Sequence, residues 1–147
     1  MEYTFQQKIA IMRILLDIIH ADGIIDARET FFFKKLKEVF ELQDEDHELV
    51  KSKNSLIALS QIKLLSDDQK ADFAGLMSDM IIVDEDINAN EVAVYDIVAE
   101  FCGINISFES LAVFIYDLIA MVSYYFVGFL GLVLMISGIV ARTKDET

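Results

Sequence analysis

The chain has 147 residues, of which 54% are hydrophobic, and a formal net charge of −13 at pH 7. A surface this acidic repels phosphate groups, so we expect no nucleic-acid binding, and the length suits one domain of ordinary size. The lone cysteine, Cys102, excludes a disulfide within the chain, and its apolar neighbours predict a buried thiol.

The absence of proline and the recurrence of apolar residues every three or four positions predict an all-α domain. This pattern indicates a first helix over residues 5–19, with Gly23 as its stop, and a second helix over residues 32–40. The polar residues 43–48 predict a loop or a short exposed turn. A third helix is expected over residues 56–65.

Stop and start signals define the next two helices. Ser66 and Gln69 have the spacing of a capping box, which predicts a fourth helix continuing through residues 73–81. A fifth helix is expected over residues 90–102, and it ends at Gly103 because glycine accepts the left-handed conformation that closes many helices. These five helices belong to a predicted helical domain, residues 1–106.

The C-terminal part of the chain predicts a membrane anchor. Residues 118–141 form a run of 24 uncharged residues, which would extend about 36 Å as a helix. That length crosses a hydrocarbon core of about 30 Å, whereas a buried core helix usually carries a polar face. We expect a transmembrane helix over residues 118–141, preceded by a connecting helix over residues 107–117 that Ser107 caps, and followed by a polar tail over residues 142–147.

Two features give opposing indications of membrane topology. Arg142 and Lys144 directly follow the uncharged run, which favours a cytoplasmic C-terminus by the positive-inside rule. The first residues lack the charged-then-apolar pattern of a signal peptide, which favours a cytoplasmic domain. We expect a single-pass protein of the inner or cell membrane with its domain in the cytoplasm.

The chain repeats one pattern of helix, acidic turn and helix. Residues 21–29, ADGIIDARE, align with residues 83–91, VDEDINANE. The alignment pairs Asp22 with Asp84, Asp26 with Asn88 and Glu29 with Glu91. Two such copies predict a pseudo-two-fold helical bundle.

Helix capping explains part of each acidic turn. Asp26 and Asn88 have the position of an N-cap, whose side chain accepts a hydrogen bond from a backbone N–H in the first turn. Glu29 and Glu91 lie three residues later, where a capping box returns a hydrogen bond to the cap residue.

A divalent-cation site is the second explanation of the acidic turns, because capping leaves Asp22, Asp84 and Asp86 without a role. An EF-hand is excluded, since Ala89 and Tyr95 replace its required glycine and glutamate. Carboxylates that converge from both turns would repel one another without a cation, and oxygen-only ligands favour Ca²⁺ or Mg²⁺. The candidate metal ligands are Asp22, Asp26, Glu29, Asp84, Asp86, Asn88 and Glu91.

The two turns also carry a family resemblance. The pattern of the first turn resembles the TerB-like fold of tellurite-resistance proteins, which also occurs at the N-terminus of the membrane-anchored co-chaperone DjlA. In this pattern a helix is followed by Ala-Asp-Gly, two apolar residues and Asp-x-x-Glu, and then by a second helix. The resemblance covers residues 5–104, and its second copy departs from the pattern at Glu85 and Asn88. It implies a helical module with a metal-binding acidic patch in membrane-associated stress-response or defence assemblies.

The leading functional hypothesis is a membrane-anchored adaptor that binds a divalent cation and docks a protein partner with a basic surface. The alternative is a membrane effector whose span forms homo-oligomers and permeabilises the membrane on a signal. Gly128, Gly131 and Gly138 form no GxxxG pair, so the sequence offers little support for close packing of spans. No Ser/His/Asp order, phosphate-binding loop or Cys/His spacing is present, so we do not expect an enzyme.

Overall fold

The computed structural model describes residues 2–21, 23–83, 87–111, 113, 117, 120–126 and 129. These residues form helices joined by turns, with no strand among them, and the prediction of an all-α fold is confirmed. The chain divides into two compact units, Met1–Leu111 and Ala112–Thr147.

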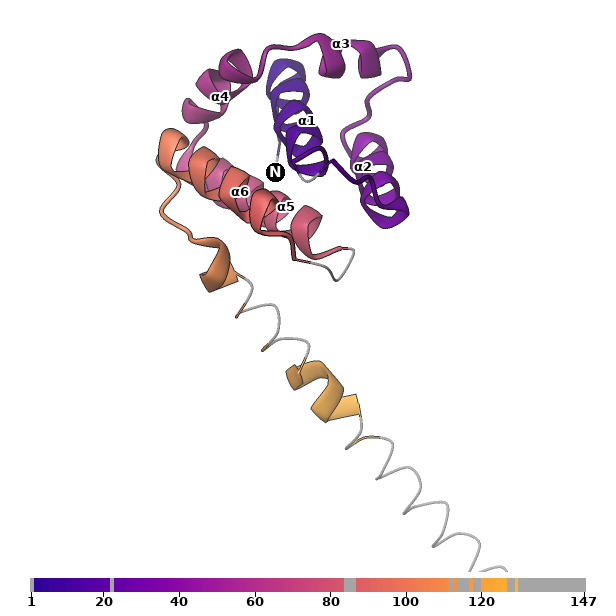
Figure 1. Ribbon diagram of the computed structural model, residues 1–147, viewed down its shortest axis with the longest axis vertical. Helices are drawn as coiled ribbons and strands as arrows, with labels where there is room; N and C mark the ends of the chain where they lie inside the picture. Colours follow the sequence, from indigo (N-terminus) through magenta and orange to yellow (C-terminus); the bar gives the residue numbers. More distant parts are fainter. Residues whose placement is uncertain are drawn as a thin grey trace, which may run out of the picture. The chain divides into compact units, whose positions relative to one another are not determined.

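The first unit is built from short helices connected by tight turns (Figure 1). In chain order they are α1 (Phe5–Ile19), α2 (Ala27–Val39), α3 (Asp46–Ser52), α4 (Ser55–Lys63), α5 (Asp67–Ile82) and α6 (Ala89–Cys102).

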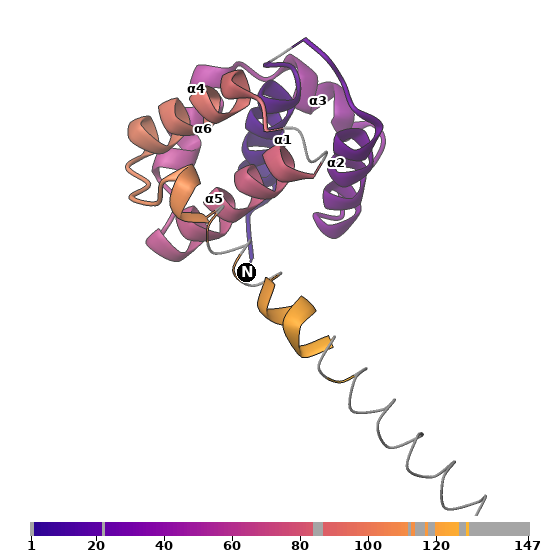
Figure 2. The same cartoon turned by 60° about the horizontal axis from the view of Figure 1, so that its bottom comes forward.

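Helix α1 is the centre of this unit and contacts each of the other five helices (Figures 1 and 2). Its sequence, FQQKIAIMRILLDII, is apolar on most sides, and a helix of that kind requires neighbours on most sides. Ile11, Met12, Leu15 and Ile18 are fully buried. Each such side chain contributes on the order of 1.5–3 kcal/mol of hydrophobic stabilisation.

The polar stripe of α1 fixes the helix to α3 and α4. Arg13 pairs with Asp17 one turn later and donates to the backbone carbonyl of Lys51, with an N···O distance of 2.7 Å. The hydroxyl of Ser55 donates to Asp17 at 2.6 Å. Charged groups that are half-buried here therefore satisfy one another instead of facing apolar surface.

Most of the predicted helix boundaries are confirmed by capping geometry. Thr4 and Ser66 each begin a helix with a complete capping box, and α1 covers the residues expected of the first helix. Gly103 ends α6 in the left-handed conformation, with φ of 68°. Ser107 accepts from the backbone N–H of Ser110, and residues 108–111 are helical as expected.

Two helical segments differ from the sequence prediction. Residues 46–48, which were expected in a loop or short exposed turn, lie in α3 (Asp46–Ser52), and Val50 anchors this short helix because only 2% of its surface is exposed. Helix α2 begins at Ala27, as the predicted capping box at Asp26 requires, and therefore before the apolar pattern that starts at residue 32. Its first turn contributes few residues to the core, and Phe31 is 62% exposed, so the apolar pattern starts later than the helix itself.

The C-terminal prediction is not supported by the part of the chain that the structure describes. Within the described ranges, no helix has the length and apolar character that a membrane crossing requires. Most of the predicted span, 118–141, and the whole predicted tail, 142–147, lie outside the described residues. Residues 120–126 are helical.

Candidate docking pocket and acidic turns

The first acidic turn is a helix cap. Oδ1 of Asp26 accepts from the backbone N–H of Arg28 at 2.7 Å, and Oε2 of Glu29 accepts from the backbone N–H of Asp26 at 2.9 Å. This reciprocal pair is the predicted capping box. The backbone N–H of Arg28 is the main cause that lowers the pKa of Asp26 below its ordinary value, and the Arg28 side chain adds to the effect.

The second acidic turn begins α6 in a related way. Oδ1 of Asn88 accepts from the backbone N–H of Asn90 at 2.8 Å, which confirms Asn88 as the N-cap. Glu91 occupies the third helical position, as Glu29 does in α2, and each of these two glutamates is only 2% exposed. The sequence repeat therefore corresponds to a repeated local structure of N-cap followed by buried glutamate.

The metal-binding prediction depends on residues that the structure places only in part. Asp22, Asp84 and Asp86 lie outside the described residues. Among the residues that are described, no three histidine, cysteine, aspartate or glutamate side chains gather closely enough to hold a metal ion. Of the candidate ligands that the structure describes, Asp26, Glu29 and Asn88 take part in capping.

Cys102 and His20 are in ordinary structural positions. The Cys102 thiol is buried, as predicted, and burial raises its pKa, so the thiolate that a nucleophile needs is disfavoured. His20 is the C-cap of α1 and is exposed to solvent.

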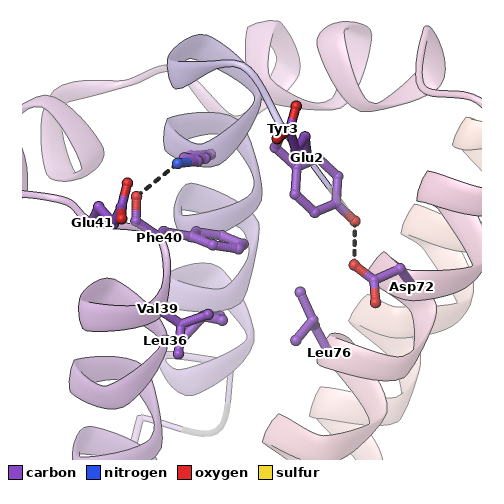
Figure 3. Close-up of a pocket in the computed structure, with 9 residues that line it drawn as sticks. Glu2, Tyr3, Leu36, Val39, Phe40, Glu41, Asp72 and Leu76 are labelled. Atoms are coloured by element: carbon purple, nitrogen blue, oxygen red, sulfur yellow. Dashed lines mark hydrogen bonds between the residues drawn. The ribbon is translucent and has the colours of Figure 1, made fainter.

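Sequence reasoning missed an open pocket of about 520 Å³ between α2 and α5, with α1 behind it (Figure 3). The N-terminal segment and the end of α2 complete its lining. The lining residues are Glu2, Tyr3, Lys8, Leu36, Val39, Phe40, Glu41, Asp72 and Leu76.

Part of the pocket wall is apolar. Leu36 and Val39 project from α2, and Leu76 projects from α5 on the opposite side (Figure 3). Val39 is 72% exposed, although it is an aliphatic residue of an ordered helix. An exposed valine beside two leucines offers a partner apolar surface to bury.

Two hydrogen bonds fix the edges of the pocket. The hydroxyl of Tyr3 donates to Oδ2 of Asp72 at 2.6 Å, while the ring of Tyr3 packs edge-on against Phe40 with centroids 5.7 Å apart. Nζ of Lys8 donates to the backbone carbonyl of Phe40 at 2.9 Å, and a cation at the C-terminal end of a helix is favoured by the helix dipole. Both bonds are drawn in Figure 3.

The pocket is acidic. Among the described residues that line it, three are acidic, Glu2, Glu41 and Asp72, and one is basic, Lys8. The surplus of two negative charges has the same sign as the −13 of the whole chain. A cationic group is therefore attracted both by the pocket and by the wider field of the protein.

Glu41 adopts an unusual backbone conformation at the rim. Its φ is 57°, the one positive φ of a non-glycine residue in the described part of the chain. The backbone N–H of Leu42 donates to the carbonyl of Lys37, and the N–H of Glu41 donates to the carbonyl of Glu38, both at 3.0 Å. This is a Schellman motif, in which glycine is the usual left-handed residue.

Comparisons with known proteins leave the family open. No model of a known protein family matches the chain, and no curated protein matches it. A crystal structure of a protein of unknown function from Porphyromonas gingivalis W83 is similar, with a TM-score of 0.60 and 20% sequence identity over 75% of this chain and 94% of that chain. At this identity the similarity indicates a shared helical fold alone.

The predicted membership of the TerB-like family is therefore wrong. No family model recognises the chain, and no described helix provides the membrane span that was predicted beside the TerB-like domain. The physical reason lies in the motif itself, because Asp-x-x-Glu at the start of a helix is a capping box. Such a signal recurs wherever helices begin and does not identify a family.

Proposed function

We propose that this chain is a membrane-tethered adaptor whose acidic helical unit docks a protein partner with a basic surface. The observation that carries the proposal is the pocket between α2 and α5, where the apolar residues Leu36, Val39 and Leu76 lie beside a surplus of carboxylates. Apolar contact supplies binding energy, whereas complementary charge supplies orientation and speed of association. A basic amphipathic segment meets both requirements.

The tether is supported by the amino-acid sequence. The uncharged run 118–141 has the length of a transmembrane helix, and the acidic unit would be repelled by anionic headgroups, so attachment depends on the run itself. The repeated N-cap and buried glutamate of α2 and α6 also support a pseudo-two-fold relationship between the halves of the adaptor domain.

Docking is tested with the full-length protein in a non-ionic detergent and short fluorescent peptides. One peptide combines leucine with arginine, and its counterpart replaces each arginine by glutamate. We expect saturable binding of the basic peptide alone, measured by fluorescence anisotropy and corrected for empty micelles, with weaker binding as salt rises. Equal binding of both peptides, or of neither, would remove the proposal.

A matched pair of variants locates the binding surface. Val39→Arg places a cation on the pocket wall, whereas Ile97→Arg makes the same change at another exposed apolar residue, on α6. Val39 and Ile97 are 72% and 63% exposed, so neither substitution disturbs the core. We expect Val39→Arg to abolish binding of the basic peptide and Ile97→Arg to preserve it.

The tether is tested separately by vesicle flotation. The full-length chain should float with phosphatidylcholine vesicles after carbonate washing, and a chain that lacks residues 118–147 should remain in the soluble fraction. Release of the full-length chain by carbonate would contradict the tether without affecting the docking experiment.

A further inference from the structure

We infer that Glu41 is a recognition residue, which pairs with an arginine or lysine that neighbours an apolar side chain of the docked partner segment. This inference rests on the proposed docking function and names the residue of the pocket that selects the partner. The apolar side chain would lie against Leu36, Val39 and Leu76, and the cation would reach the carboxylate at the rim.

The backbone of Glu41 provides the first argument. Its left-handed conformation brings the side chain close to the backbone, a penalty that glycine avoids. The motif that ends α2 needs that conformation at this position, as the paired backbone hydrogen bonds of Glu41 and Leu42 indicate. Folding alone would favour glycine at position 41, so the fold does not account for the glutamate.

The surroundings of the carboxylate provide the second argument. In the described part of the chain, Glu41 forms no ion pair, whereas the nearby acidic residues Glu38 and Asp44 are paired with Lys35 and Lys37. Lys8, the one ammonium in the pocket, donates instead to the backbone carbonyl of Phe40. The Glu41 carboxylate is exposed and lines the pocket, so an external cation can approach it.

The acidic residue of the opposite wall, Asp72, already has a hydrogen-bond partner. Asp72 also lines the pocket, but its Oδ2 already accepts the hydrogen bond from the Tyr3 hydroxyl (Figure 3). Asp72 thus has a structural role in joining the N-terminal segment to α5, while Glu41 has none that the described residues reveal. Both residues line the same pocket, and their combined charge disfavours an anionic occupant.

The variants Glu41→Gly and Glu41→Gln separate recognition from folding. Glu41→Gly removes both the carboxylate and the left-handed penalty, so we expect its melting temperature to rise by roughly 2–4 °C while its affinity for the basic peptide falls about 3- to 10-fold. Glu41→Gln keeps a side chain of the same shape and loses the charge. It should melt close to the unmodified protein and lose affinity to a similar extent.

The control is Glu100→Gln, which makes the same change in net charge at an exposed position on α6. We expect it to leave peptide affinity unchanged. If it weakens binding as much as Glu41→Gln does, the peptide senses only net charge and the inference is overturned.

The remaining outcomes distinguish the inference from the docking function. If Val39→Arg abolishes peptide binding but both Glu41 variants preserve it, the docking pocket stands and the role of Glu41 is overturned. A lower melting temperature for Glu41→Gly would show that glutamate serves the fold, and would overturn the inference as well. If the unmodified protein binds no basic peptide, the docking function itself fails.

Discussion

The Tyr3 hydroxyl donates to Oδ2 of Asp72 at 2.6 Å, which joins the N-terminal segment to α5. The same hydroxyl lies 3.1 Å from the backbone carbonyl of Gln69, and the Tyr3 ring contacts Phe40 at the end of α2. Tyr3 therefore connects the two walls of the pocket, although Asp72 lies 69 residues away along the chain. Tyr3 is thus one of the contacts that hold the two walls together.

Tyr3→Phe should weaken this connection without emptying the core. The ring remains against Phe40, but the hydrogen bond to Asp72 is lost, which we expect to lower the free energy of unfolding by about 1 kcal/mol. Urea titration of the full-length protein measures the change. Tyr124→Phe is the control, because Tyr124 is 78% exposed, and an equal loss in both variants would show that the hydroxyl bond is unimportant.

Two buried tyrosines predict a loss of stability at alkaline pH. Burial, followed by the hydrogen bond to Asp72, raises the pKa of Tyr3, and burial raises the pKa of Tyr95 to about 12. The folded protein thus holds these protons more tightly than the unfolded chain, in which tyrosine titrates near pH 10. Stability contributed by both groups is complete below about pH 10 and is lost as pH rises through their folded pKa values.

Absorbance at 295 nm measures this titration directly. We expect part of the tyrosine signal to appear only above pH 11, together with unfolding, and Tyr95→Phe to reduce that late fraction. The hydroxyl of Tyr95 donates to the backbone carbonyl of Ile106 at 2.8 Å, so this variant also tests how the segment after α6 is held. A single titration near pH 10 in the folded protein would contradict the prediction.

Local signals in the sequence were sufficient to predict much of the fold. Ser66 and Gln69 predicted the start of α5, and Gly103 predicted the end of α6, because capping and left-handed stops depend on a few adjacent residues. Asp26 and Glu29 were likewise identifiable as a capping box, whether or not a cation also binds nearby.

The pocket could not be predicted in the same way. Its two walls carry Val39 and Leu76, which are far apart in the sequence and meet only after α1 has organised the unit around it. Helix α3 was missed because its polar residues outnumber the one buried valine, Val50. A signal did exist at Glu41, a glutamate directly after a helix at the position where glycine is usual, but it is informative only once the helix end is known.

Asp26→Asn should make α2 less sensitive to acid. The Asp26 carboxylate has a lowered pKa, so its contribution to stability is present above the ordinary value near pH 4 and is lost as pH falls through the folded pKa. Asparagine also caps helices but does not titrate in this range. We expect a shallower fall in melting temperature between pH 5 and pH 3 for Asp26→Asn, and parallel profiles in the two proteins would contradict this assignment.

Two glycines should respond to alanine with opposite signs. Gly75 lies within α5, and a Cβ there would meet nothing within 4 Å, so Gly75→Ala should stabilise the protein by about 0.5–1 kcal/mol. Gly103 has φ of 68°, so Gly103→Ala should destabilise it by about 1 kcal/mol, although space is also available. Urea titration of both variants tests the pair. Changes of equal sign would show that the α6 stop does not need the left-handed conformation.

The cation hypothesis for the acidic turns remains a prediction. Glu29 and Glu91 are buried at the start of α2 and α6, and each follows one of the aspartates Asp22 and Asp84 by seven positions in the sequence. If a cation binds there, Ca²⁺ or Mg²⁺ should raise the melting temperature, because an ion that binds only the folded chain stabilises it by mass action.

The variant Asp22→Asn combined with Asp84→Asn distinguishes a cation site from helix capping. These two aspartates are paired by the repeat and have no role in capping, so their loss should abolish stabilisation by Ca²⁺ while Asp26 continues to cap α2. General screening of a chain with a charge of −13 also raises the melting temperature, but this effect occurs in both proteins and is matched by sodium chloride of the same ionic strength. Melting curves with Ca²⁺, Mg²⁺ or a chelator therefore decide the question. Identical shifts in the two proteins would leave the acidic turns as helix caps alone.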